Sequence, residues 1–319
     1  MSEIEILIRS AKRLTGLMII FIIILITTAI LHFGVSMRWF SAEPSSMPSN
    51  DEGVLIAYGR ELIEHTSLFL GPRGTVRRTS NGMNCQNCHL EGGTKAFSAN
   101  FITTAATYPK FRKRSGIVES LHKRINDCLE RSLNGKALAA DSREMQAMIA
   151  YMKSLGRNAK AGSEVVGAGL ISLPFLGRPA SPDAGKGIYA KRCAVCHGAA
   201  GEGKRDKNNG EWQYPPLWGP DSYNTGAGLF RISKFAAFVK ANMPYGASHR
   251  SPVLSDEEAW DVAAYVNSMP RPHRVFAGDW PEVSSKPMDY PFGPYADPYP
   301  ETQHKFGPFG PIVSNRKGR

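Results

Sequence analysis

Two pentapeptides decide the fold of this 319-residue chain: CQNCH at residues 85–89 and CAVCH at residues 193–197. Cys-x-x-Cys-His is the attachment motif of c-type haem, in which both thiols bind the porphyrin and the histidine ligates iron. The alternative is a zinc site built from two Cys-x-x-Cys pairs, but these pairs lie far apart and each is followed directly by histidine. Two covalently bound c-type haems are therefore predicted. Their attachment residues are Cys85, Cys88, Cys193 and Cys196, and their proximal iron ligands are His89 and His197.

The surroundings of the two motifs repeat, which indicates an internal duplication. A candidate helix precedes each motif, and a closing helix follows each, at residues 141–156 and 254–269. In the second closing helix Ser255 and Glu258 form a capping-box pattern. The predicted fold is mostly α, with two tandem cytochrome c domains after an N-terminal transmembrane helix. In each domain a first helix crosses the closing helix, and haem completes a core that would otherwise be too small.

The predicted organisation follows from composition. A Gly, Ala and Pro-rich linker joins the domains, and a Pro and aromatic-rich tail without helical or strand period ends the chain. We expect this tail to be an extended strap that packs on the domains. The predicted boundaries are 1–40 for a cytoplasmic tail and membrane anchor, 41–51 for a tether, 52–157 for the first cytochrome c domain, 158–181 for the linker, 182–270 for the second domain and 271–319 for the tail.

The N-terminal region predicts the cellular location. Residues 14–35 are apolar and long enough to span a bilayer. Arg9, Lys12 and Arg13 precede this stretch and only Arg38 follows closely, so the positive-inside rule places the globular part in the periplasm, anchored to the inner membrane. The net charge of +11 is spread along the chain without an RNA-binding or helix-turn-helix signature. Nucleic acid is therefore not an expected partner.

The sixth iron ligands differ between the domains. Met243 in ANMPYG (241–246) follows His197 in a loop before the closing helix, where a cytochrome c carries its methionine ligand. The first domain has no such loop, and its remaining candidates are His122 and Cys128. Cys128 lies in RINDCLERSLNGKAL (124–138), a predicted helix whose spacing gathers Arg124, Arg131 and Ser132 around the sulfur. Cys128 is thus an iron ligand, an inert buried thiol or half of an intermolecular disulfide.

Several longer motifs carry a family resemblance. They are NGMNCQNCHLEGGT (81–94), RINDCLERSLNGKAL (124–138), PPLWGPDSYNTGAGL (215–229), ANMPYG (241–246), LSDEEAWDVAAYVNSMPRP (254–272), and the tail from KPMDYPFGPYAD to HKFGPFGPI. Over roughly residues 50–312 the chain resembles the dihaem thiosulfate dehydrogenases that form tetrathionate. The loop at 95–111 departs from the family pattern. Asn242 stands where some relatives have a lysine that competes for the iron.

The resemblance implies an enzyme that couples two thiosulfates into tetrathionate and releases two electrons. It implies that the first haem, ligated by His89 and Cys128, is the active site, and that the second, ligated by His197 and Met243, passes electrons to an acceptor cytochrome or a membrane redox complex. Two readings compete with this one. The chain is either a membrane-tethered dihaem electron carrier, or a tetrathionate reductase that runs the reverse reaction.

Elementary electrostatics agrees with the family reading. Joining two thiosulfate dianions requires fixed cations that offset their repulsion. Arg124 and Arg131 are candidate donors to sulfonate oxygens, and Ser132 could add a hydrogen bond. The alternative is that one or both arginines pair with haem propionates or with Asp127 and Glu130. A further hypothesis makes Cys128 a nucleophile that leaves the iron and carries a sulfur adduct.

Overall fold

The computed structural model describes residues 14–28, 51–160 and 165–317. The chain divides into two compact units, Met1–Ser45 and Ser46–Arg319. The first unit holds a helix over residues 14–28 with exposed side chains. Among the described residues, no helix is both long and apolar enough to cross a membrane. The rest of the predicted span, 29–35, and the tether at 41–50 lie outside the described residues.

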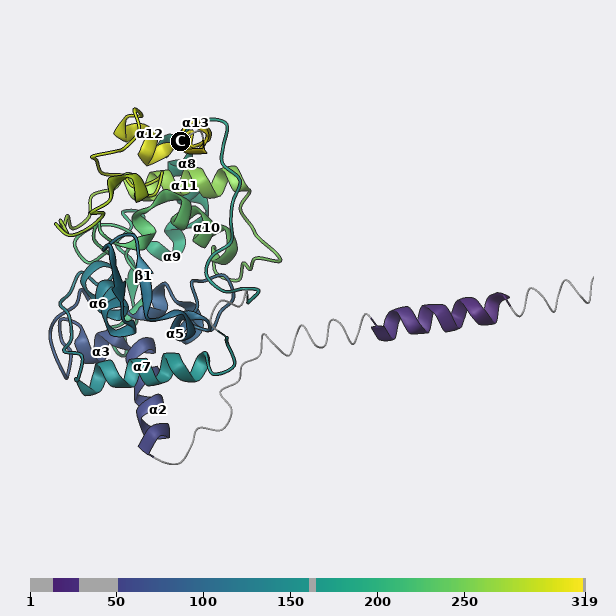
Figure 1. The fold of residues 1–319 in the computed structure, drawn as a ribbon, viewed down its shortest axis with the longest axis horizontal. Coiled ribbons are helices and arrows are strands. Elements are labelled where there is room, and N and C mark those ends of the chain that lie inside the picture. The colour runs from purple at the N-terminus through teal and green to yellow at the C-terminus, as the bar shows by residue number, and fades with distance from the viewer. Residues whose placement is uncertain (1–13, 29–50, 161–164, 318–319) are drawn as a thin grey trace, which may run out of the picture. The chain divides into compact units, whose positions relative to one another are not determined.

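Two crossed helices form the frame of the first cytochrome c domain: α2 (Asp51–Glu64) and α7 (Arg143–Leu155) (Figure 1). They approach so closely at Gly59 that a Cβ there would lie 2.0 Å from the Ala147 carbonyl oxygen. Ser142 caps α7 by accepting a hydrogen bond from the Met145 amide, and Met145 is fully buried in the core. The other elements of this domain are α3 (Thr66–Leu70), η1 (Cys85–Asn87), α4 (Leu90–Gly93), α5 (Thr104–Thr107), β1 (Lys110–Arg112), β2 (Ile117–Glu119) and α6 (Leu121–Arg131).

The second domain repeats this crossing with α8 (Pro182–Arg192) and α11 (Asp256–Ser268). Gly185 takes the place of Gly59, because a Cβ on it would lie 2.0 Å from the Asp261 carbonyl oxygen. The capping box predicted at Ser255 and Glu258 is confirmed. Between the crossed helices lie α9 (Ala194–His197), β3 (Lys204–Arg205), β4 (Trp212–Tyr214), η2 (Gly228–Phe230) and α10 (Ile232–Asn242). Each of the two small sheets, β1–β2 and β3–β4, is an antiparallel hairpin.

Glu211, just before β4, ties the second domain to the first. Its buried carboxylate accepts hydrogen bonds from the Ser67 hydroxyl and the Asn84 side-chain amide, both at 2.9 Å. The Nδ1 atom of His65 lies 2.7 Å from the same carboxylate. Because Asn84 directly precedes the first haem motif, this contact links a loop of one domain to the cofactor segment of the other.

The tail packs on both domains. The Asp279 carboxylate pairs with Arg131 in the first domain, and the fully buried Asp289 carboxylate pairs with Arg231 in the second. The predicted strap is ordered, but it also contains η3 (Val283–Ser285), α12 (Glu301–Phe306) and α13 (Gly310–Lys317), the last two beside α8 and α11 in Figure 1. These elements have no clear amphipathic period. Their core contacts, including the fully buried Ile312, are made with distant residues.

Candidate haem sites and active site

The second haem motif opens onto the larger of two cavities, of about 640 Å³. His197 ends helix α9 and is 91% buried, and its Nδ1 donates to the Pro215 carbonyl oxygen at 2.8 Å, which leaves Nε2 free as a ligand atom. Burial lowers the pKa of His197, opposed by the hydrogen bond to Pro215, and so favours the neutral ring. Met243 follows α10 directly and lines the same cavity, as its loop position predicts.

The larger cavity also reaches the first haem motif. Cys88 and Leu90 line it together with His197 and Met243. Tyr223, which is 3% exposed, lines it from the second domain. The two cofactor segments therefore share one cavity wall, so the fold brings them together although they lie more than a hundred residues apart in sequence.

The first haem motif opens onto the smaller cavity, of about 360 Å³. The Nδ1 atom of His89 lies 2.6 Å from the Ala99 carbonyl oxygen, the same arrangement that His197 has with Pro215. Cys85 lines this cavity, and its sulfur accepts a hydrogen bond from the Thr66 hydroxyl at 3.3 Å. His89 and Cys128 both line the cavity, as the proposed ligand pair requires.

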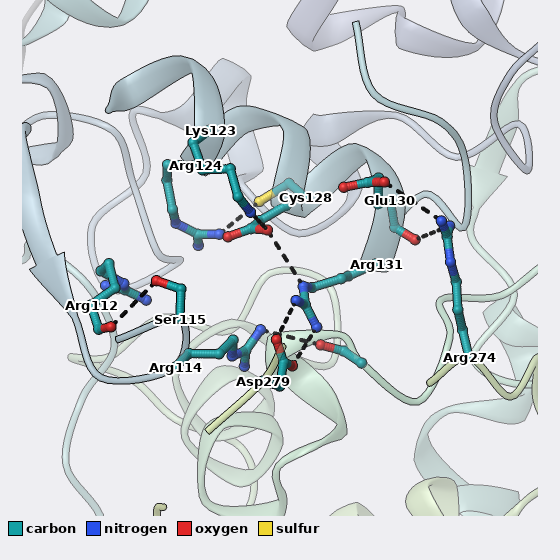
Figure 2. Close-up of polar contacts among 12 residues, drawn as sticks. Arg112, Arg114, Ser115, Lys123, Arg124, Cys128, Glu130, Arg131, Arg274 and Asp279 are labelled. Atoms are coloured by element: carbon teal, nitrogen blue, oxygen red, sulfur yellow. Dashed lines mark hydrogen bonds and ion pairs between the residues drawn. The ribbon is translucent and has the colours of Figure 1, made fainter. Parts of the chain in front are cut away.

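Cys128 has the electrostatic setting of a thiolate. Burial raises the pKa of Cys128, and the Arg124 guanidinium opposes this effect. Arg124 Nη1 donates to the sulfur at 3.2 Å, as Figure 2 shows. Burial raises the pKa of Cys85 and of Cys88 to about 12, so Cys128 stands apart from its neighbours. None of the five cysteines, all of which lie in the described part of the chain, forms a disulfide.

His122, the other sequence candidate for this ligand, lies elsewhere. Its Nδ1 is 2.7 Å from the Ser120 hydroxyl oxygen at the start of α6, and it does not line either cavity. Cys128, two turns further along α6, points into the smaller cavity instead.

Two buried donors support the fit of haem in the larger cavity. Trp212 lines that cavity, and its Nε1 is buried without a hydrogen-bond acceptor among the described residues. Nε and Nη1 of Arg271 are also buried without an acceptor, and the guanidinium stacks 4.3 Å from the ring of Tyr223. A haem brings two carboxylates, the kind of acceptor that such donors require. The cysteine pairs, the histidines and these donors fit the cofactor.

Arg124, Arg131 and Ser132 were predicted to surround the Cys128 sulfur. Only Arg124 of the three is hydrogen-bonded to it. Arg131 makes two 2.7 Å hydrogen bonds to the Asp279 carboxylate (Figure 2). Its guanidinium also stacks 3.7 Å from the ring of Phe276. Ser132 caps the end of α6 through its backbone amide. Neither residue lines the smaller cavity. Helical spacing could not show that the tail supplies a carboxylate to Arg131 from 148 residues away.

The segment from 95 to 112 supplies cavity residues that sequence reasoning missed. Thr104 and Thr107 of α5, then Tyr108, Lys110 and Arg112, line the smaller cavity. Among the described residues no carboxylate pairs with Lys110 or Arg112. Burial raises the pKa of Tyr108, an effect partly opposed by the neighbouring arginines. In the sequence, only the basic residues of the hairpin indicated that this segment could belong to an anion-binding site.

Comparison with known proteins assigns the chain to a family. Residues 75–161 match the family model described as SoxA/TsdA, cytochrome c domain, and residues 182–270 match that of cytochrome c. The chain is 41% identical to a thiosulfate dehydrogenase of Allochromatium vinosum, over 71% of this chain and 82% of the relative. The chain belongs to the thiosulfate dehydrogenase family. As a member it is an enzyme with two c-type haems, as the resemblance implied.

Two further relatives agree. A thiosulfate dehydrogenase of Stutzerimonas stutzeri is 41% identical over 72% of each chain, and one of Psychrobacter arcticus is 37% identical over 75% of this chain and 70% of the relative. Among solved structures, thiosulfate dehydrogenase (TsdBA) from Marichromatium purpuratum superposes with a TM-score of 0.66 at 32% identity. That comparison covers 76% of this chain and half of the length of the other.

Proposed function

We propose that this protein oxidises two thiosulfates to tetrathionate at the first haem and passes the two electrons through the second haem to an external acceptor. The observation that carries the proposal is the smaller cavity, in which Cys128 and Arg124 lie beside the first proximal histidine. The identity of the substrate is inferred from the names of the relatives, which are thiosulfate dehydrogenases.

The charges of this cavity suit the reaction. The overall change is 2 S₂O₃²⁻ → S₄O₆²⁻ + 2 e⁻, so two dianions must approach each other while one S–S bond forms. Arg124, Arg112 and Lys110 line the cavity and offset part of this repulsion. Guanidinium groups donate paired hydrogen bonds that match the oxygens of a sulfonate. When bound, the two haems accept one electron each.

Cys128 would hold the iron of the first haem together with His89, and Met243 would hold that of the second together with His197. A thiolate donates electron density to haem iron, whereas methionine raises its reduction potential. Electrons are therefore expected to move from the first haem to the second. Arg124 holds Cys128 as a thiolate through the 3.2 Å hydrogen bond. A released thiolate would join a first thiosulfate, Cys-S⁻ + S₂O₃²⁻ → Cys-S-SSO₃⁻ + 2 e⁻, with the two haems, when bound, taking one electron each. A second thiosulfate would then attack the adduct, Cys-S-SSO₃⁻ + S₂O₃²⁻ → S₄O₆²⁻ + Cys-S⁻, and so return the thiolate.

The anchor and the periplasmic location belong to the proposal as well. Residues 14–35 form one continuous apolar run after three basic residues, and residues 14–28 of it are helical. We propose that this run holds the enzyme at the inner membrane, with the globular unit in the periplasm. The acceptor is then a cytochrome or a redox complex at that membrane.

A thiosulfate-dependent ferricyanide reduction assay on the haem-loaded protein tests the proposed function. The expected result is two ferricyanides reduced and one tetrathionate formed for every two thiosulfates consumed. A plain electron carrier would exchange electrons with reduced cytochromes but would form no tetrathionate. A protein that only reduces tetrathionate in the presence of an electron donor would reverse the proposed direction.

A further inference from the structure

Tyr108 has a hydroxyl group that the protein does not use. Its oxygen is buried, and no described residue lies within hydrogen-bond distance of it. The ring packs against the core of the first domain, while the residue lines the smaller cavity. A buried hydroxyl without a partner costs about 1–3 kcal/mol, so it requires an acceptor that the chain alone lacks.

The charged neighbours of Tyr108 indicate what that acceptor is. Arg124 and Arg112 are the cations that act on its phenol, and the Glu119 carboxylate and the Cys128 sulfur oppose them. Both arginines line the cavity and Glu119 does not, and Arg124 is hydrogen-bonded to the sulfur. The two guanidinium groups are therefore the charges near Tyr108 that an anion in the cavity would meet. An anion bound between these arginines would place its oxygens near an unpaired O–H donor.

Tyr108 belongs to the segment 95–111, which forms one wall of the cavity. A residue of this wall that contacts the substrate would contribute to its binding.

We propose that the Tyr108 hydroxyl donates a hydrogen bond to a sulfonate oxygen of the thiosulfate bound beside Cys128, and so sets the affinity of this subsite for sulfur oxyanions. The inference rests on the proposed function for the identity of the substrate. It assigns Tyr108 a contact with the substrate and no step of electron transfer. Arg124 and Arg112 would supply the charge, and Tyr108 would supply a directed donor between them.

The test uses the haem-loaded full-length protein with Tyr108→Phe. A hydrogen bond to a charged acceptor contributes about 1.5–3 kcal/mol, so the KM for thiosulfate should rise about 10-fold or more while kcat changes less than about 2-fold. The dissociation constant of sulfate, an unreactive dianion, should rise by a similar factor when binding is followed by the electron paramagnetic resonance spectrum of the first haem. The substrate-free reduction potential of that haem should not change.

Tyr58→Phe is the matched control. Tyr58 is in the same domain and donates to Glu144 at 3.1 Å, but it does not line the smaller cavity. This variant loses a hydrogen bond of its own and should keep the wild-type KM and sulfate affinity. Tyr108→Phe removes no contact within the protein, so it should retain full haem content and the wild-type melting temperature.

Two results would overturn the inference. One is an unchanged KM together with an unchanged sulfate affinity. The other is an unchanged KM with a shifted substrate-free potential, which would mean that the hydroxyl contacts a haem carboxylate. If the wild-type protein did not oxidise thiosulfate, the proposed function would fail, but the sulfate titration would still decide whether Tyr108 contacts an oxyanion.

Discussion

The two cytochrome c domains share a frame and differ in the segment that faces the iron. In both, a glycine of the first helix, Gly59 or Gly185, lies against the backbone of the closing helix. In both, Nδ1 of the proximal histidine lies beside a backbone carbonyl oxygen. The proposed sixth ligand, however, is Met243 after the end of α10 in one domain and Cys128 inside α6 in the other.

The cavities that these two ligands line differ in charge. Charged residues of both signs, among them Lys95, Arg192 and Glu211, line the larger cavity, whereas the charged residues that line the smaller cavity are Lys110, Arg112 and Arg124. A cavity lined by cations without carboxylates suits a haem that binds anions. The two domains thus share the crossed helices and the setting of the proximal histidine. They differ in the segment between the haem motif and the closing helix, which carries the proposed second iron ligand.

The strongest test of this comparison is Cys128→Met, which gives the first haem the ligand type of the second. The kcat for thiosulfate oxidation should fall about 1,000-fold or more, because the variant lacks the Cys128 thiolate, the proposed iron ligand and nucleophile. The reduction potential of the first haem should rise. Potentiometric titration and the ferricyanide assay measure both effects. Retained turnover in a fully haem-loaded variant would show that the thiolate is dispensable.

Arg131→Gln separates stability from chemistry on helix α6. The variant leaves Asp279 buried without its partner, so the free energy of unfolding should fall by about 3–5 kcal/mol, as for other broken buried ion pairs. Guanidinium unfolding followed by circular dichroism measures this loss. The double variant Arg131→Met, Asp279→Leu should recover most of it. A loss below about 1 kcal/mol in the single variant would contradict a structural role for this pair.

Arg124→Gln should act on the site itself, because it removes both a cation for the substrate and the donor that holds Cys128 as a thiolate. Loss of a charged donor should raise the KM for thiosulfate about 10-fold to 50-fold, equivalent to about 2 kcal/mol. Steady-state kinetics measures the change, and Arg124→Lys should recover part of it.

Lys123→Gln is the control for that variant, because Lys123 pairs with Asp127 on the same helix and does not line the cavity. An equal rise in KM for Lys123→Gln would indicate that the KM depends on the overall charge of the surface and not on a binding site beside Cys128.

Glu211→Gln has the smallest expected effect. It tests whether the two domains unfold together. The amide can still accept one hydrogen bond, but it loses the charge that faces His65, so stability should fall by about 1–2 kcal/mol. Unfolding transitions followed at the absorption bands of the two haems should coincide in the wild type and separate in the variant. Glu202→Gln, which changes an exposed carboxylate within its own loop, should leave them together.

Features that depend on local spacing were predictable. The closing helices expected at 141–156 and 254–269 run from Arg143 to Leu155 and from Asp256 to Ser268. Their caps were visible because a cap residue and its partner lie three positions apart. Met243 was predicted as a ligand from its place after one helix and before another, and it follows α10 and lines the larger cavity.

Features that depend on distant partners were not predictable. Arg131 looked like a substrate ligand because its neighbours in the helix include Cys128, but the tail carboxylate of Asp279 holds it. Tyr108 and Arg112 looked like ordinary loop residues, because only the folded chain brings them to the wall that faces Arg124.

The sequence alone determined the two haem attachments, the duplicated helices and the odd cysteine on a helix, since each of these is a pattern within a few turns of chain. The tertiary structure alone decided which cations face that cysteine and which are held by carboxylates. Helical periodicity brings a side chain to a face, but its partner is whichever group long-range packing delivers there. For Arg124 that group is the Cys128 sulfur, and for Arg131 it is the Asp279 carboxylate.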